Sequence, residues 1–262
     1  MIPSFRAELV KILRRRVLIV TALTTALFSV GSATIVIASA ETTGSSPSDR
    51  GVTIASLSEA GGGTEVFMTA VSFAGTFLFV VFVGVFAVEF ARGTVRTALL
   101  FQPRRIRLLT GKTAALLAFA GAVIAAAELL TWTAARLLAP SQDIATDRWV
   151  GTAAVGDGLA DYATVMLWLT GYALLGMTLA VLVRSVPIAL AIGIAWAGPF
   201  EHLLQDAWNP AQRYFPGLLL EALAAGGTNQ VSATQALATV TAYVVVAVTV
   251  ALTVFTRRDI TT

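Results

Sequence analysis

"VFMTAVSFAGTFLFVVFVGVFAV", residues 66–88, is a run of 23 residues without Asp, Glu, Lys, Arg or His. A helix needs about 20 mainly apolar residues to cross a hydrocarbon core of roughly 30 Å. The whole chain is similarly apolar, with 56% hydrophobic residues, 13% charged residues and a mean hydropathy of +0.80. Water-soluble domains carry fewer apolar and more charged residues. The stretch therefore predicts a transmembrane helix in a membrane protein.

Five further segments on either side of this run are candidates for membrane spans. Three of them are equally free of charged residues, whereas 113–139 contains Glu128 and Arg136, and 186–204 is apolar only as far as Pro199. We therefore predict an all-α membrane protein with six transmembrane helices in one domain covering residues 1–262. The expected spans are residues 17–40, 66–88, 113–139, 162–183, 186–204 and 231–256.

The distribution of positive charge predicts the orientation of these spans, because Lys and Arg are retained on the cytoplasmic side of a membrane. Fourteen of the 18 basic residues fall on one side of the predicted topology, in the N-terminal segment, between spans 2 and 3, between spans 4 and 5, and after span 6. Acidic residues predominate in the opposite connections. We expect a multi-pass protein with both termini in the cytoplasm.

The N-terminal segment is predicted to form an interfacial helix over residues 3–15. Its apolar residues recur at helical spacing, while its basic residues lie mainly on the rest of the helix surface, as in helices that lie along a leaflet. A topology signal without a helix explains the charges equally well. A cleaved signal peptide is disfavoured, because an apolar run of 24 residues exceeds the usual length of about 7–15.

The connection between spans 2 and 3 contains a Gly-Lys-Thr triplet that imitates part of a nucleotide-binding loop. A complete loop needs a glycine five residues before Gly111, where this chain has Ile106, and the triplet leads into a membrane span. We therefore expect no nucleotide site, and we expect Lys112 to contact acidic lipid headgroups or, as the alternative, an acidic partner surface. Topology alone explains the basic residues, so we expect no nucleic-acid partner.

The same connection shows the pattern of a short helix that Pro103 ends. Glu89 and Arg92 are spaced to pair at i and i+3, and Val95, Leu99 and Leu100 are expected to share an apolar face. A loop that serves only topology does not need such a face, although a helix lying at the membrane interface does. The pattern favours a helix that docks on a partner or on the membrane.

These residues resemble the ABC-2 type permeases, the membrane subunits of ABC exporters with the type V fold. The resemblance rests on "FRAELVKILRRR" before span 1, "EFARGTVRTALLFQPRRIRLLTGK" after span 2, six expected spans and no nucleotide-binding domain. It implies a bacterial cell membrane location and a cytoplasmic coupling helix between spans 2 and 3 that docks on a separate ATP-binding cassette ATPase. The residues implied in this contact are Glu89, Arg92, Gly93, Thr94, Val95, Arg96, Leu99 and Pro103.

Two of the connections expected on the external side have a distinctive composition. Between spans 5 and 6, over residues 199–227, three prolines and interface-seeking aromatic residues favour a pair of short helices that dips into the outer leaflet, with a plain exposed loop as the alternative. Residues 41–65 are rich in Gly and Ser and predict a flexible connector.

Candidate residues for a translocation path are Glu128 and His202. An ionisable group inside a membrane is costly, so Glu128 is a functional candidate, and Arg136 is too distant along the same helix to reach it directly. For Glu201 and His202, a solvated helix end is the simplest explanation. The chain has no cysteine and one histidine, so we expect no catalytic site, no metal site and no cofactor.

Three functions remain open from the residues. The first is the membrane subunit of an ATP-driven exporter, paired with an ATPase, with a second permease subunit and with membrane lipid. The second is an ion-coupled secondary transporter, although such carriers usually have internal repeats and none is evident. The third is a membrane anchor or scaffold that does not transport.

Overall fold

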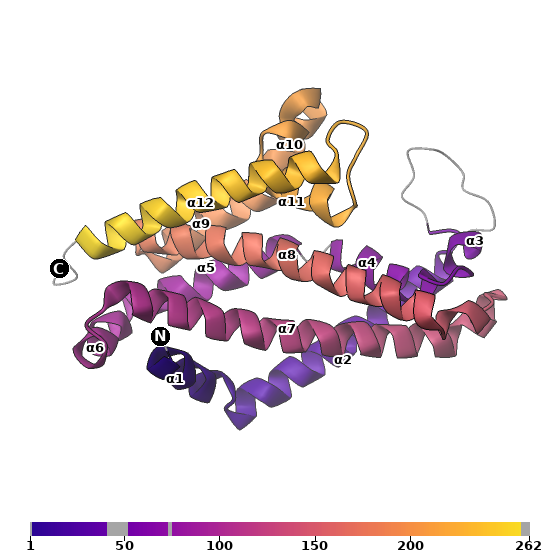
Figure 1. Ribbon diagram of the computed structural model, residues 1–262, viewed down its shortest axis with the longest axis horizontal. Coiled ribbons are helices and arrows are strands. Elements are labelled where there is room, and N and C mark those ends of the chain that lie inside the picture. The colour runs from indigo at the N-terminus through magenta and orange to yellow at the C-terminus, as the bar shows by residue number, and fades with distance from the viewer. Residues whose placement is uncertain (1, 41–51, 73–74, 258–262) are drawn as a thin grey trace. The chain divides into compact units, whose positions relative to one another are not determined.

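The computed structural model describes residues 2–40, 52–72 and 75–257. Throughout these ranges the chain forms helices joined by turns, with an isolated β-bridge between Gly227 and Ser232 and no strand (Figure 1). The prediction of an all-α protein is confirmed. In lipid, a helix is one of the two structures that satisfy every backbone hydrogen bond internally, which is why long charge-free runs predict helices so well.

Four helices are long and apolar enough to cross a membrane, which indicates a membrane-embedded protein. A fifth candidate is a bent pair of helices, Phe77–Ala91 and Thr94–Phe101, and α9 (Val186–Ala195) is a shorter apolar helix. The number of six crossings therefore stays a prediction. The four long helices are α2 (Arg15–Ala38), α7 (Arg105–Leu138), α8 (Thr152–Val183) and α12 (Ala233–Arg257).

Both α7 and α8 begin well before the spans expected at residues 113–139 and 162–183. The expected bounds followed the apolar residues, whereas a helix makes its backbone hydrogen bonds irrespective of side-chain polarity and continues beyond the hydrocarbon. As a result, the basic residues from Arg105 to Lys112 lie on a helix and not in a loop.

The chain divides into two compact units, each of which includes one half of α7 and of α8. The unit of residues 12–73 and 119–166 contains α2, α3 (Ile54–Leu57), α4 (Gly62–Ser72) and the 3₁₀ turns η1 (Ala139–Gln142) and η2 (Asp147–Trp149). Its buried core includes Ile37, Leu57, Val66 and Trp149.

The prediction of a flexible connector over residues 41–65 is wrong for residues 54–65, which form α3, a turn and the start of α4. The side chain of Leu57 is fully buried, and its carbonyl accepts a hydrogen bond of 2.7 Å from the Trp149 indole. The hydroxyl of Thr53 caps α3 by accepting from the backbone N–H of Ser56. The Gly-Ser stretch at 44–48 lies outside the described residues.

The other unit consists of residues 1–11, 74–118 and 167–262. In it, α5 packs against α9, and the backbone at Gly176 of α8 lies so close to Val83 that a Cβ there would be 3.2 Å from the Val83 nitrogen. This unit contains α1 (Ile2–Ile12) up to Lys11, together with α5 (Gly75–Ala91), α6 (Thr94–Phe101), α9 (Val186–Ala195), α10 (Glu201–Ala207) and α11 (Pro216–Ala224).

The segment expected as span 5 is interrupted. Between α9 and α10 the chain forms the π-helical turn η3 (Trp196–Phe200), which contains Pro199. Proline has no N–H to donate and disturbs the regular helical hydrogen bonds, so a local change of helix type is expected there. After the 3₁₀ turn η4 (Asn209–Arg213), α11 packs along α12, so the expected pair of short helices is present as α10 and α11.

Candidate functional site

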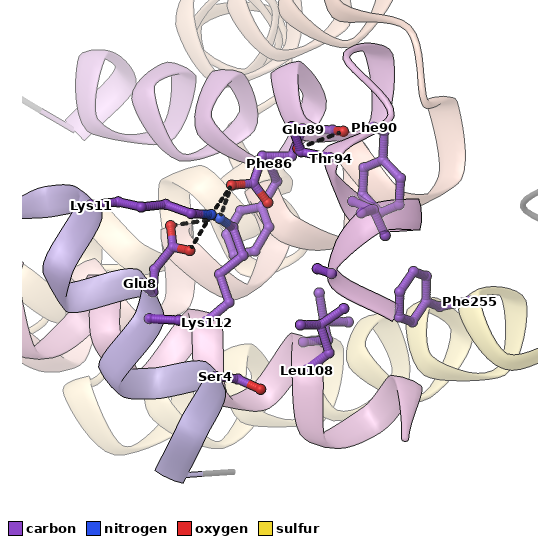
Figure 2. A pocket seen from close by; sticks show the side chains of 14 residues that line it. Ser4, Glu8, Lys11, Phe86, Glu89, Phe90, Thr94, Leu108, Lys112 and Phe255 are labelled. Atoms are coloured by element: carbon purple, nitrogen blue, oxygen red, sulfur yellow. Dashed lines mark hydrogen bonds and ion pairs between the residues drawn. The ribbon is translucent and has the colours of Figure 1, made fainter. Parts of the chain in front are cut away.

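Four charged side chains from three helices meet in one cluster (Figure 2). Glu8 and Lys11 come from α1, Glu89 from the end of α5 and Lys112 from the second turn of α7. We call this set the charge cluster. Its two carboxylates and two ammonium groups balance, so it is neutral as a whole.

The distances within the charge cluster are those of direct ion pairs. The Nζ atom of Lys112 lies 2.7 Å from Oε1 of Glu8 and 2.5 Å from Oε1 of Glu89. The Nζ atom of Lys11 lies 3.0 Å from Oε2 of Glu8 and 3.3 Å from Oε1 of Glu89. Each ammonium group therefore bridges both carboxylates, which ties α1 to α5 and α7.

The contribution of these ion pairs to stability depends on their burial, because an exposed ion pair contributes little and a buried one is costly to break. The side chain of Lys112 is only 8% exposed, and its ammonium also lies 5.7 Å from the centre of the Phe86 ring. This corrects the expectation that Lys112 contacts lipid headgroups. Its place in the Gly-Lys-Thr triplet is explained by pairing with α1 and α5.

The charge cluster also lowers the pKa of Glu8 below its ordinary value of 4.5. Burial alone would raise this pKa, but the hydrogen bond and positive charge of Lys112, followed by those of Lys11, outweigh burial. The carboxylate of Glu8 is consequently held in its ionised form, and a depressed pKa contributes stability above about pH 4.5 that is lost as pH falls through the folded-state pKa.

We therefore expect the stabilising effect of Glu8 to disappear in acid. Melting temperatures of the purified chain and of a Glu8→Gln variant, measured in detergent between pH 6 and pH 3, should differ most at pH 6 and converge towards pH 3. The other carboxylates titrate in both proteins, so the difference isolates Glu8. A gap that stays constant over this range would contradict the lowered pKa.

The bend after α5 creates the short helix α6. The direction of the chain changes by 76° between Phe77–Ala91 and α6. Gly93 makes the bend possible, since its φ of +67° lies in the left-handed region that residues with a Cβ rarely adopt. The hydroxyl of Thr94 then donates to the carbonyl of Glu89 at 3.2 Å. Glu89 thus belongs to α5, which corrects the single helix expected from Glu89 to Pro103.

The apolar residues of α6 do not share one face as expected. Val95 is 7% exposed and lines a cavity of about 140 Å³ together with the charge cluster, and Leu99 is half-buried. In contrast, Leu100 is 83% exposed and Phe101 is 85% exposed. The exposed apolar surface of α6 therefore consists of Leu100 and Phe101, and Val95 packs against its own chain.

The remaining residues named for this segment surround α6. Arg92 and Arg96 are exposed, so their charges remain on the surface of the bend. Pro103 follows the end of α6 at Phe101, as expected for a helix stop. From the start of α7, the guanidinium of Arg105 donates at 2.9 Å to the carbonyl of Phe255, near the end of α12. A cation at a helix C-terminus is favourable, so this contact fixes the end of α12.

The two candidates for a translocation path lie in different units. Glu128 is buried near Gly158 and Thr64, and the guanidinium of Arg136 lies 5.3 Å from the centre of the Trp132 ring. The His202 ring is 3.3 Å from a Glu221 carboxylate oxygen. Neither arrangement by itself identifies a path.

Glu201, expected at a solvated helix end, is instead 1% exposed. Its Oε2 atom accepts a hydrogen bond of 2.9 Å from the backbone N–H of Leu218 in the first turn of α11. A carboxylate at a helix N-terminus satisfies an N–H that has no partner within the helix. The one sign of this contact in the sequence is an acidic residue among apolar neighbours.

Comparison of the chain with protein-family models, with curated proteins and with solved structures finds no match in any of the three. The residues and their geometry are thus the basis for inferring a function.

Proposed function

We propose that this chain is the membrane-spanning subunit of an ATP-driven exporter in a bacterial cell membrane. A separate ATP-binding cassette ATPase would bind at α6, and a second membrane subunit would complete the transporter. The observation that carries the proposal is the bend of 76° that turns the end of an apolar helix into the short helix α6 with exposed apolar side chains. The resemblance to the ABC-2 type permeases supports the same function.

The position of α6 suits a coupling element. Leu100 and Phe101 offer apolar surface to a partner, and the exposed Arg92 and Arg96 offer positive charge beside it. Charge complementarity at the rim of an interface contributes to orientation, while buried apolar anchors contribute most of the affinity. An ATPase surface with an apolar groove and acidic residues around it would match this arrangement.

The charge cluster would transmit motion from α6 to the membrane helices. Thr94 is hydrogen bonded to the same residue, Glu89, whose carboxylate pairs with α1 and α7. When two ATPase subunits close on ATP, they would push the α6 helices of two membrane subunits. The three helices joined by the charge cluster would then shift together, changing the pair between inward-open and outward-open arrangements.

The proposal predicts that truncating the exposed surface of α6 removes the ATPase. A Leu100→Ala/Phe101→Ala variant, purified with an affinity tag from membranes of the cells that make the protein, should lose most of the co-purifying ATPase. Full burial of an apolar side chain is worth about 1.5–3 kcal/mol, so affinity should fall at least about tenfold. The measurements are vanadate-sensitive ATP hydrolysis and mass spectrometry of the partner, which should contain a complete Gly-x-x-x-x-Gly-Lys-Ser/Thr loop.

A Leu129→Ala/Leu137→Ala variant is the matched control, because it removes two similarly exposed leucines from α7. It should retain the ATPase. The proposal is overturned if the unmodified chain brings down no nucleotide-binding subunit, or if the α6 variant and the control retain it equally. Six membrane crossings and cytoplasmic termini are part of the same proposal. The ATPase binds ATP in the cytoplasm, so α6 must lie on that side of the membrane.

A further inference from the structure

A second cavity, of about 230 Å³, lies among α5, α8, α9 and α11. Most of its lining is apolar, from side chains that include Phe79, Leu175, Leu179 and Ile192. Drug-sized sites usually measure about 300–1,000 Å³, so this cavity suits a smaller molecule. All the residues that line it belong to one compact unit.

Two buried polar atoms at this cavity have no hydrogen-bond partner among the described residues. Oε2 of Glu201 caps α11, and the Trp196 side chain and the Gly217 backbone also interact with the carboxyl, but Oε1 has no aligned hydrogen bond from any described residue. The hydroxyl of Tyr172, which is 2% exposed, likewise has no partner within the described part of the chain. Leaving such groups unpaired in an apolar setting is costly, so each calls for an explanation.

The aromatic rings around the cavity add a preference for positive charge. The rings of Phe79 and Tyr172 lie 5.7 Å apart in a tilted arrangement, and Trp196 contributes a third ring to the lining. Cations bind favourably over aromatic faces, and the indole of Trp is the strongest such partner. A buried carboxyl oxygen beside these rings is the complement of an ammonium group, because burial of a carboxylate is tolerated when it is paired.

We propose that this cavity binds a small amphipathic organic cation. Its ammonium N–H would donate to Oε1 of Glu201, with the Tyr172 hydroxyl as a second polar contact, and its apolar body would fill the space against Phe79 and Ile192. A neutral molecule of the same shape lacks the charge that would pair with Glu201. The inference concerns binding alone and does not depend on the exporter proposal.

Binding of phenethylammonium to the purified chain in detergent tests the proposal, with 2-phenylethanol as the neutral isostere and 3-phenylpropionate as the anion. Isothermal titration should show saturable binding of the cation and at least about tenfold weaker binding of the other two, because a charge-assisted hydrogen bond is lost. Detergent micelles without protein provide the background for partitioning.

The Glu201→Gln variant should bind the cation at least about tenfold more weakly and bind the alcohol with unchanged affinity. The amide oxygen of this variant can still accept from Leu218, so α11 keeps its cap. Glu221→Gln is the matched control. It also replaces a carboxylate by an amide, but at a residue of α11 that does not line the cavity. Absence of saturable binding overturns the proposal, as does a cation affinity that Glu201→Gln leaves unchanged or that Glu221→Gln reduces equally.

Discussion

Replacing Lys112 by alanine is expected to destabilise the protein by about 3–5 kcal/mol, because the substitution leaves two largely buried carboxylates without their main counter-charge. Glu8 and Glu89 each lie within 2.7 Å of the Lys112 ammonium. Lys11 stays in the charge cluster and compensates in part, which places the effect towards the lower end. Thermal unfolding in detergent should show a melting temperature lowered by about 6 °C or more.

The control is Lys11→Ala, which removes the same charge from the same cluster. The side chain of Lys11 is 51% exposed, so its loss should cost no more than about 1 kcal/mol. Adding Glu8→Gln to Lys112→Ala should recover part of the loss, because it removes one of the unpaired carboxylates. Equal melting temperatures for the two single lysine variants would mean that the ion pairs of Lys112 are not buried as described.

Gly62→Ala is expected to destabilise the unit that contains α2, α3 and α4 by about 3 kcal/mol. A Cβ at residue 62 would overlap the backbone carbonyl of Leu57, and backbone cannot rotate away as a flexible side chain can. Leu57 itself is held by burial and by the hydrogen bond from Trp149. Thermal unfolding and limited proteolysis near α3 would measure the loss.

Gly156→Ala in α8 is the opposite case and the control for Gly62→Ala. Outside its own helix, no atom of the described residues lies within 4 Å of the position of its Cβ, so alanine fits without displacement. Within a helix, alanine is favoured over glycine by about 0.5–1 kcal/mol, and a small gain in stability is expected. If both variants lose stability equally, the close approach of Gly62 to Leu57 does not explain the effect.

The sequence was sufficient to predict the helical class and the approximate place of the apolar helices. Residues 17–40 and 231–256 correspond closely to α2 and α12, since a membrane leaves a long charge-free segment few alternatives to a helix. The starts of α7 and α8 were not predicted. Counting the apolar residues needed to cross the hydrocarbon core gives the length of the buried segment and not the length of the whole helix.

The candidate site was predicted only in part. The segment that follows α5 was recognised, but the pairing of Lys112 with Glu8 joins residues 104 positions apart, and local spacing carries no information about such contacts. One signal was available: Glu8 is the only acidic residue in a basic N-terminal segment. Similarly, the exposure of Leu100 and the burial of Val95 depend on the bend at Gly93, which helical periodicity cannot place.

The connection between α6 and α7 leaves little slack. Only residues 102–104 separate Phe101 from Arg105, and an extended chain spans at most about 3.6 Å per residue. A shift of α6 larger than this tether allows must drag the first turn of α7 with it. In that turn, Arg105 donates a hydrogen bond to the carbonyl of Phe255, near the end of α12. A pull on α6 would accordingly reach α12 through a link of only three residues.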